Sequence, residues 1–355
     1  MGGGIVRKKV VKLIDYTFQH RFQLLGAFDD SNSMRYLSLD LDIHLIGRFN
    51  CPTIEHRIVS GDDYSYIVTF LPGLFSPRDV VEYVLKLNPD IIHLHGTHTW
   101  SRYLYYAERF RKDSNCKLIF SGAGPSTGTP EFLANFDKVV VNHKIQIERM
   151  KCEPEKVIVR KRSADPNVFY PVEKKKEYDF LMVAGFIPGK RIDIMIDYVL
   201  NTNYTMVVLG DFTRKTNHYK FIKRYILQNK AEDQIFLYNF IPQVKISEFM
   251  GKCRAWVWPQ CKPENPSTTT NRSVIEALAC GLPLLVGSQA FKSTEFVRNG
   301  INGWLYGNID DFKWKADNII NDYKRMGKNS SIINRDNFNF KENFIDFYND
   351  LYQNL

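Results

Sequence analysis

The sequence predicts an α/β protein built from two doubly wound domains. Strand and helix patterns alternate along both halves of the chain, which is typical of parallel sheets covered by helices. A charged segment at residues 173–177 interrupts this alternation, which then starts again. The length of 355 residues is enough for two domains. We therefore expect an N-terminal domain over residues 1–171 and a C-terminal domain over residues 178–335.

The first half shows seven short apolar runs that we interpret as strands. They lie at residues 10–15, 43–47, 65–70, 90–95, 117–121, 139–142 and 156–159. Two helices are predicted between them, at residues 77–87 and 100–112. The first has Ser76 as its N-cap and Pro77 at its first position, where proline costs no hydrogen bond.

The second half repeats the pattern and ends in a helix. Its strands are predicted at residues 179–184, 204–209, 234–238, 255–258 and 284–286. Helices are predicted at residues 191–200, from after Asp211 to about residue 229, and at residues 246–253 and 273–280. Apolar residues recur at helical spacing in residues 340–355, so we expect a closing helix that packs back on the N-terminal domain. Ligands of doubly wound sheets bind beyond the carboxyl ends of the strands. Two such sheets therefore predict a cleft between the two domains.

Composition and charge exclude several classes of protein. The chain is 44% hydrophobic and 25% charged, as in ordinary globular proteins, and its formal net charge is +9. The positive charge is spread along the chain, so we expect no nucleic-acid partner. No apolar run is long enough to span a membrane, and no signal peptide is expected. Scattered single cysteines indicate a reducing compartment. We expect a cytoplasmic protein, and peripheral contact with a membrane surface is also compatible with the charge.

Residues 265–286 combine a polar loop, a helix and a buried strand. The loop feeds the helix N-terminus through Asn271, Arg272 and Ser273. Free backbone N–H groups and the helix dipole make such a terminus suitable for a diphosphate. Glu276 lies about one turn into the helix, where its carboxylate can accept hydrogen bonds from ribose hydroxyls. An ordinary loop–helix–strand unit with a solvated glutamate is the alternative that these residues leave open.

The same stretch carries a resemblance to a known family. The residues IEALACGLPLLV, followed by TEFVRNGINGWLY, are similar to the C-terminal signature of retaining GT-B glycosyltransferases of family 4. That family has two Rossmann-like domains facing across a cleft, and its signature has two glutamates separated by seven residues. Glu276 matches the second glutamate, whereas the first falls on Thr268. The resemblance therefore implies a catalytic position at Thr268, where the family's carboxylate is missing, and a donor site around Glu276.

Three other segments resemble the same family, so that the motifs together cover about residues 160–306. Residues 163–171 are similar to the segment that ends the first domain, and residues 237–242 to a turn beside the nucleobase. Residues 183–191 are similar to a loop whose lysine meets the donor diphosphate. The resemblance implies a catalytic role for Lys190 and donor-binding roles for Gly185, Phe186, Arg191, Gly210, Phe240 and Pro242. Phe186 stands where the family usually has arginine, so Arg191 or Arg272 could supply that cation. For Lys190 the alternative is a solvated cationic turn, and for Phe240 and Pro242 the alternative is a packed turn.

Three histidines lie close together at the end of a predicted strand, namely His93, His95 and His98. His93 and His95 share one face of the strand, a pattern that can bind metal. No acidic or cysteine residue has matching spacing, and the resemblance implies no bound metal, so we expect none. His95, at the strand end, is the better catalytic candidate; a buried, hydrogen-bonded histidine is the alternative. The family's usual histidine falls on Ala123.

The resemblance implies a retaining transferase that moves a hexose from a nucleoside-diphosphate sugar to a hydroxyl acceptor on a glycan. GDP-mannose is the favoured donor and UDP-glucose the next. The donor is a substrate, and no tightly bound cofactor is expected. Thr268 and Ala123 leave open a catalytically inactive GT-B protein that binds sugar nucleotides, and a GT-B nucleotide-sugar epimerase is a further alternative. A homodimer is also compatible with the sequence, and the N-terminal half resembles members encoded by large DNA viruses.

Overall fold

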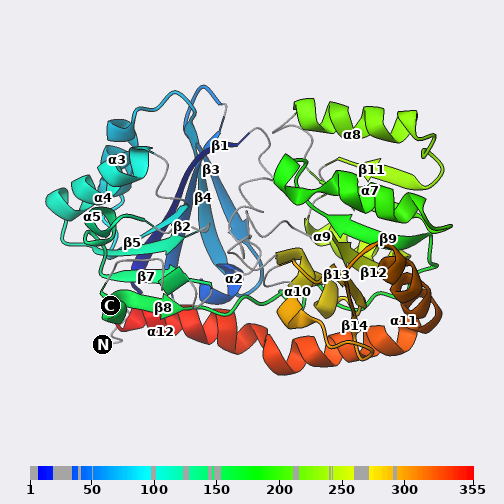
Figure 1. Ribbon diagram of the computed structural model, residues 1–355. Coiled ribbons are helices and arrows are strands. Elements are labelled where there is room, and N and C mark those ends of the chain that lie inside the picture. The colour runs from blue at the N-terminus through cyan, green and yellow to red at the C-terminus, as the bar shows by residue number, and fades with distance from the viewer. Residues whose placement is uncertain are drawn as a thin grey trace. The chain divides into compact units, whose positions relative to one another are not determined.

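The computed structural model contains two compact units. The N-terminal unit comprises Met1–Lys161 and Lys341–Leu355, and the C-terminal unit comprises Arg162–Phe340. Each is built around its own sheet (Figure 1). The described residues are 7–18, 34–38, 41–49, 51–96, 101–122, 128–142, 146–147, 153–210, 216–239, 241, 243–259, 272–290 and 294–355.

The N-terminal unit has an eight-stranded sheet in the order β3-β4-β2-β1-β5-β6-β7-β8. All neighbouring strands are parallel except β3, which pairs antiparallel with β4 at the edge. The strands are β1 (Lys9–Phe18), β2 (Asp42–Phe49), β3 (Glu55–Ser60), β4 (Ser65–Pro72), β5 (Ile91–Gly96), β6 (Lys117–Gly122), β7 (Lys138–Val141) and β8 (Val157–Val159). The helices are α2 (Met34–Leu37), α3 (Pro77–Lys86), α4 (Ser101–Asp113), α5 (Pro130–Leu133), the short η2 (Pro154–Lys156), the π-helix η5 (Lys341–Asp346) and α12 (Phe347–Gln353).

Helix α3 begins at the predicted cap. The Ser76 hydroxyl accepts a hydrogen bond from the Asp79 backbone N–H, and the Asp79 carboxylate accepts one from the Ser76 N–H. This reciprocal pair satisfies two backbone donors that the helix itself leaves unpaired. The buried face of α3, with Val80, Val81 and Val84, belongs to the core that covers one side of the sheet.

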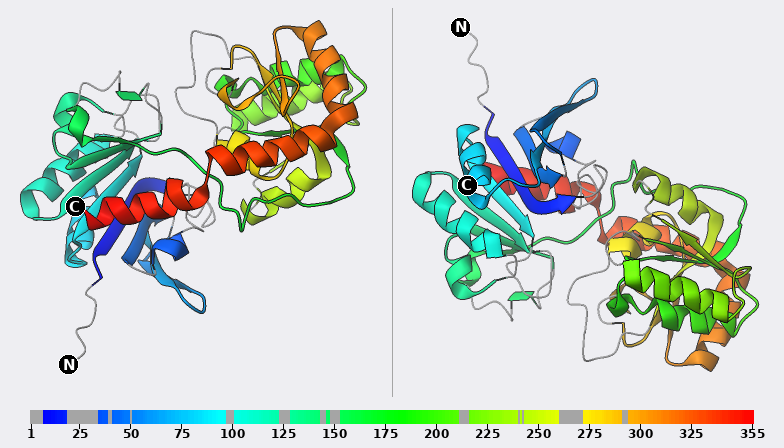
Figure 2. Two further views of the ribbon diagram at one scale, coloured as in Figure 1. Left: turned by 90° about the horizontal axis from the view of Figure 1, so that it is seen from below. Right: turned by 90° about the horizontal axis from the view of Figure 1, so that it is seen from above.

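Successive residues of a strand point to opposite faces, and this alternation separates two environments in the N-terminal sheet. Leu13 and Leu94 belong to the same buried cluster as α3 and α4. Lys12 and His93, which are opposite each other in β1 and β5, instead contact α12. Figure 2 shows α12, in red, lying along this sheet. The C-terminal residues thus close the face of the N-terminal sheet that α3 leaves uncovered.

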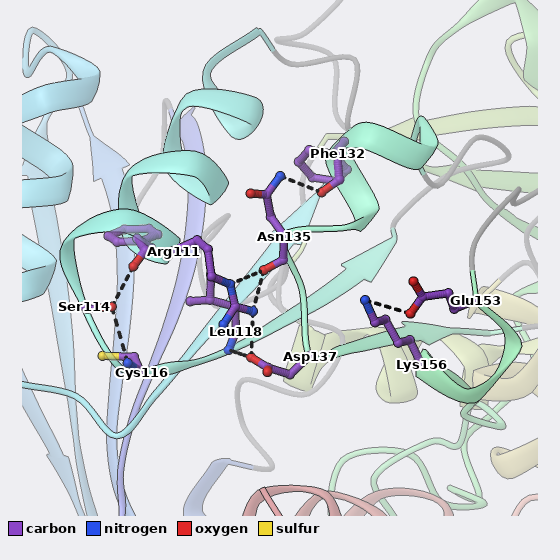
Figure 3. A network of polar contacts seen from close by, with 10 residues as sticks. Arg111, Ser114, Cys116, Leu118, Phe132, Asn135, Asp137, Glu153 and Lys156 are labelled. Atoms are coloured by element: carbon purple, nitrogen blue, oxygen red, sulfur yellow. Dashed lines mark hydrogen bonds and ion pairs between the residues drawn. The ribbon is translucent and has the colours of Figure 1, made fainter.

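A polar network joins α4 to the start of β7 (Figure 3). The Asp137 carboxylate accepts hydrogen bonds from the Leu118 backbone N–H at 2.7 Å and from the Arg111 guanidinium at 2.9 Å. Arg111 also donates to the carbonyl oxygen of Asn135. One carboxylate therefore satisfies a strand-end N–H and anchors the last turn of a helix.

The C-terminal unit has a parallel six-stranded sheet in the order β11-β10-β9-β12-β13-β14. The strands are β9 (Tyr178–Val183), β10 (Met206–Leu209), β11 (Ile235–Tyr238), β12 (Cys253–Trp258), β13 (Leu284–Gly287) and β14 (Gly303–Tyr306). The helices are η3 (Pro188–Lys190), α7 (Ile192–Leu200), α8 (Thr216–Gln228), α9 (Gln243–Lys252), α10 (Arg272–Ala279), η4 (Thr294–Phe296) and α11 (Ile309–Asn337). Val168 and Phe169, which precede β9, are buried in the core of this unit.

None of the helices in the described ranges combines the length and the apolar character that a membrane span needs.

Candidate functional site

The C-terminal sheet reverses its strand order between β9 and β12. From β9 the chain adds β10 and β11 on one side, and from β12 it adds β13 and β14 on the other. The segments that follow these two central strands therefore leave in opposite directions. In doubly wound sheets a ligand binds outside the carboxyl ends of the strands at such a reversal. This edge of the C-terminal unit is the candidate site.

Lys190 lies at this reversal. It ends η3, in the segment that follows β9, and its Nζ is 5.2 Å from the ring centroid of Trp258, the last residue of β12. An ammonium group over an indole ring is attracted by the ring's negative face. The Trp258 carbonyl oxygen accepts a hydrogen bond from the Tyr306 hydroxyl at 2.9 Å, which fixes the end of β12. A cation is thus held between the two strands that flank the reversal.

Gly185 and Gly210 differ sharply in their surroundings. A Cβ atom added at Gly210, directly after β10, would lie 2.1 Å from the carbonyl oxygen of Ala184, so only glycine fits there. The same addition at Gly185 would meet nothing within 4 Å. Phe186 covers Gly210; its side chain is buried and makes an edge-to-face contact with Tyr219 at 5.5 Å. At the position where the resembling family has a cation, this chain has a packing residue.

Arg191 is held by a neighbouring carboxylate. Its Nη2 lies 3.0 Å from Oδ2 of Asp193, and its Nε lies 3.2 Å from Oδ1, so the contact is bidentate. The residue has φ = 47° as it starts α7, a left-handed conformation that is uncommon outside glycine. Arg191 therefore lies near the reversal with its charge already balanced.

Helix α10 is joined to the end of β9. The Ser273 hydroxyl donates a hydrogen bond to the carbonyl oxygen of Val183 at 3.2 Å. One turn further on, Oε1 of Glu276 lies 2.8 Å from Nε of Arg272, with side-chain exposures of 7% and 25%. Glu276 is thus a buried carboxylate rather than the solvated one of the alternative interpretation. Its partner reaches it from the first turn of the same helix.

Four of the predicted residues lie outside the described residues: Thr268, Phe240, Pro242 and Asn271. The described predicted residues of the C-terminal unit are Gly185, Phe186, Lys190, Arg191, Gly210, Arg272, Ser273 and Glu276. They lie between β9 and α7, directly after β10, or on α10. The sequence prediction missed Trp258 and Asp193. A tryptophan that ends a strand before a polar loop is the available signal for the first, and the i, i+2 spacing of Arg191 and Asp193 for the second.

In the N-terminal sheet the strand order reverses between β1 and β5, and His95 is the penultimate residue of β5. Its side chain is half-buried, and its backbone carbonyl oxygen accepts a hydrogen bond from the Tyr103 hydroxyl at 2.7 Å. His95 therefore lies at the corresponding edge of the N-terminal unit.

His93 is a buried, hydrogen-bonded histidine. Its Nδ1 lies 2.7 Å from the Tyr352 hydroxyl, and its Nε2 lies 2.6 Å from the Ser121 hydroxyl. Both ring nitrogens are therefore occupied, and burial lowers the pKa of His93 well below its ordinary value. Within the described residues, no three histidine, cysteine, aspartate or glutamate side chains gather as a metal ion would require.

Solved structures share this fold over nearly the whole chain. Sucrose-phosphate synthase of Thermosynechococcus elongatus has a TM-score of 0.74 at 14% identity, covering 98% of this chain and 99% of the other. HepE of Anabaena, in complex with UDP-glucose, has a TM-score of 0.71 at 14% identity, covering 97% and 99%. The fold is GT-B, as predicted from the sequence.

Sequence comparison narrows the resemblance. Residues 165–332 match the model of the family described as "Glycosyl transferases group 1". An uncharacterized glycosyltransferase of Methanocaldococcus jannaschii is 26% identical over 202 residues, which are 55% of this chain and 54% of that protein. The chain thus spans about half the length of this curated relative. The predicted resemblance to these glycosyltransferases is confirmed for group 1, and the family match lies wholly within the C-terminal unit.

Proposed function

We propose that this chain is a retaining glycosyltransferase that moves a hexose from a nucleoside-diphosphate sugar to a hydroxyl of a glycan. One observation carries the proposal: a cation and a buried carboxylate both lie at the strand reversal of the C-terminal sheet. The cation is Lys190, in the segment after β9, and the carboxylate is Glu276, on the helix α10 that follows β12. The cation is suited to phosphate and the carboxylate to hydroxyl groups.

The proposed roles follow from charge and placement. In the transfer the bond between the sugar and the diphosphate breaks, and the departing diphosphate gains negative charge. Lys190 stabilises that charge in the transition state, an effect that is strong because the cation is fixed in advance. Glu276 accepts hydrogen bonds from the ribose, and the backbone N–H groups at the start of α10 bind phosphate oxygen atoms.

For the sugar end of the reaction we propose a front-face substitution. The departing phosphate takes the proton of the acceptor hydroxyl, and the sugar keeps its anomeric configuration. The N-terminal unit would supply the acceptor site, with His95 at the strand edge as its candidate residue. GDP-mannose remains the donor favoured by the family resemblance, and the UDP-glucose complex of HepE supports UDP-glucose as the second candidate. We place this reaction in the cytoplasm.

Titration calorimetry with GDP-mannose, UDP-glucose, GDP and UDP, followed by a transfer assay, tests the proposal. We expect one nucleotide family to bind and its sugar to be transferred with retention. Lys190→Gln should lower the transfer rate about 10²–10³-fold, as the loss of one transition-state donor typically does. Lys324→Gln, an exposed position on α11, is the matched control and should have no effect. Binding of neither nucleotide would refute the proposal.

A second candidate is a sugar-nucleotide-binding protein without transfer activity. The buried side chain of Phe186 supports it, because the site lacks a cation that the resembling family usually has. Tight donor binding with no product in the same assay would favour this candidate. A product with one inverted sugar hydroxyl and no acceptor would instead identify an epimerase.

A further inference from the structure

Arg272 is placed against the local preferences of its helix. It is the first residue of α10, where the helix dipole is positive and a cation is unfavourable. Its ion pair with Glu276 also has the weaker of the two orders, with the cation on the N-terminal side. Residues that break local rules without an evident structural benefit are often functional. Arg272 therefore calls for an explanation beyond helix stability.

The geometry of the pair supplies one. The Arg272 guanidinium lies 2.8 Å from the carboxylate of Glu276, one turn further along the same helix. Glu276 is almost fully buried, and a buried carboxylate is costly unless it is paired. Arg272 is the more exposed member, so it can leave when another hydrogen-bond donor takes its place on the carboxylate.

The neighbouring side chains make this exchange useful. Phe186 contributes no charge, and Arg191 is bound to Asp193 at 3.0 Å. Lys190 is the cation already placed at the reversal, over Trp258. Among the described residues at the reversal, a second cation for a diphosphate can come from a pair that donor binding itself opens. The pair between Arg272 and Glu276 has this property, because the proposed ligand of Glu276 is part of the donor.

We propose that Arg272 is an exchangeable partner of Glu276 that couples recognition of the ribose to recognition of the diphosphate. Without donor, the guanidinium occupies the Glu276 carboxylate. When a donor binds, the ribose hydroxyls replace the guanidinium, which turns toward the helix N-terminus and binds the diphosphate. The inference rests on the proposed function. It implies that the site discriminates against free nucleosides, which must open the ion pair and offer no phosphate in return.

This exchange makes Arg272→Gln act in opposite directions on two ligands. A nucleoside no longer competes with the guanidinium, so its affinity should rise about two- to fivefold, the equivalent of a modest ion pair. A nucleoside diphosphate loses a charge-assisted hydrogen bond, so its net affinity should fall about fivefold or more. The preference for diphosphate over nucleoside should therefore shrink by at least about tenfold. A purely structural role for Arg272 would change both affinities in the same direction.

The experiment measures the affinities of guanosine, GDP, uridine and UDP for the full chain and four variants. Arg272→Gln should show the opposite shifts, and Arg272→Lys, which keeps the charge without the planar fork, should be intermediate. Lys190→Gln should weaken the diphosphate without strengthening the nucleoside. Arg335→Gln, an exposed arginine of α11, is the matched control and should change neither.

The outcomes separate the inference from the function. If the unmodified chain binds none of the four ligands, the proposed function is refuted and the inference with it. If it binds one diphosphate and Arg272→Gln changes nucleoside and diphosphate affinities by the same factor, or changes neither, the exchange is refuted and the function stands. Should Arg272→Gln fail to fold, equal factors in Arg272→Lys decide against the exchange in the same way.

Discussion

Acid should destabilise the N-terminal unit through His93. This side chain is fully buried, and its pKa lies well below the ordinary 6.5. Burial is the largest cause, and the charges of Lys12, His95 and Arg160 act in the same direction. The Tyr352 hydroxyl, which contacts Nδ1, stays protonated because burial raises its pKa. In the folded chain His93 is therefore neutral well into the acid range.

The sign and size of the effect follow from proton linkage. Below about pH 6.5 the unfolded chain binds a proton at His93 and the folded chain does not, so stability is complete above this pH and is lost as the pH falls. Between about pH 7.5 and pH 5.5 the loss is about 1.4 kcal/mol, because the unfolded chain takes up the proton over this range while the buried His93 of the folded chain stays neutral. In His93→Gln this contribution should be absent, although the variant should be less stable at neutral pH.

Hydrogen exchange of peptides that contain Ile91–Gly96 measures this effect. The difference between the variant and the unmodified chain at one pH cancels the pH dependence of the intrinsic exchange rate. It also cancels His44, whose pKa burial lowers as well and which both proteins carry. The stability difference between the two proteins should therefore narrow by about 1.4 kcal/mol on going to pH 5.5. Parallel pH profiles would refute the reasoning.

The remaining predictions concern the C-terminal unit. Glu276→Ala should weaken binding of the free nucleoside diphosphate by about 1.5–3 kcal/mol in a folded protein, and unchanged affinity by calorimetry would contradict the ribose assignment. Transfer should survive a chelator because Lys190 and helix N–H groups neutralise the diphosphate; a loss that added metal restores would count against this. Gly210→Ala should lower thermal stability, whereas Gly185→Ala should leave it unchanged, since an added Cβ has space at Gly185 and none at Gly210. Glu264, four residues before Thr268, is the carboxylate that we expect to supply the missing charge. Thr268→Glu should therefore raise transfer little or lower it by crowding, and Glu264→Gln should lower it. Full activity of Glu264→Gln would exclude that compensation.

Much of the fold could be predicted because its strands are buried on both faces. Such strands read as short apolar runs between polar segments, and the alternation with helices then implies a parallel sheet. Every predicted strand overlaps a strand of the structure, and α3 starts at the predicted cap. The cap was predictable because Ser76, Pro77 and Asp79 satisfy the helix N-terminus by local contacts alone.

The edge of the N-terminal sheet could not be predicted in this way. Strand β3 pairs antiparallel with β4, and no residue of β3 is buried. A strand without a buried face leaves no alternating pattern in the sequence. Its existence depends on the backbone hydrogen bonds that β4 offers at the edge, which are independent of side-chain type.

Contacts of the candidate site between residues close together in the sequence could be predicted. Arg272 directly precedes the predicted helix that carries Glu276, and the i, i+4 spacing of the two residues already permits an ion pair. By contrast, the contact between Lys190 and Trp258 joins residues far apart in the chain. It requires that β9 and β12 be neighbours in the sheet, and sequence patterns do not determine strand order.

Two buried polar side chains, one in each unit, show how packing separates structural groups from functional ones. His93 has partners on β6 and α12 that are themselves buried, so no ligand can reach it without opening the core. The partner of Glu276 is a partly exposed cation one turn away on the same helix, so it can be moved without opening the core. The free energy of exchanging a partner is therefore small at Glu276 and large at His93. By this criterion Glu276 has the properties of a group that binds a ligand. His93, in contrast, belongs to the core that attaches α12.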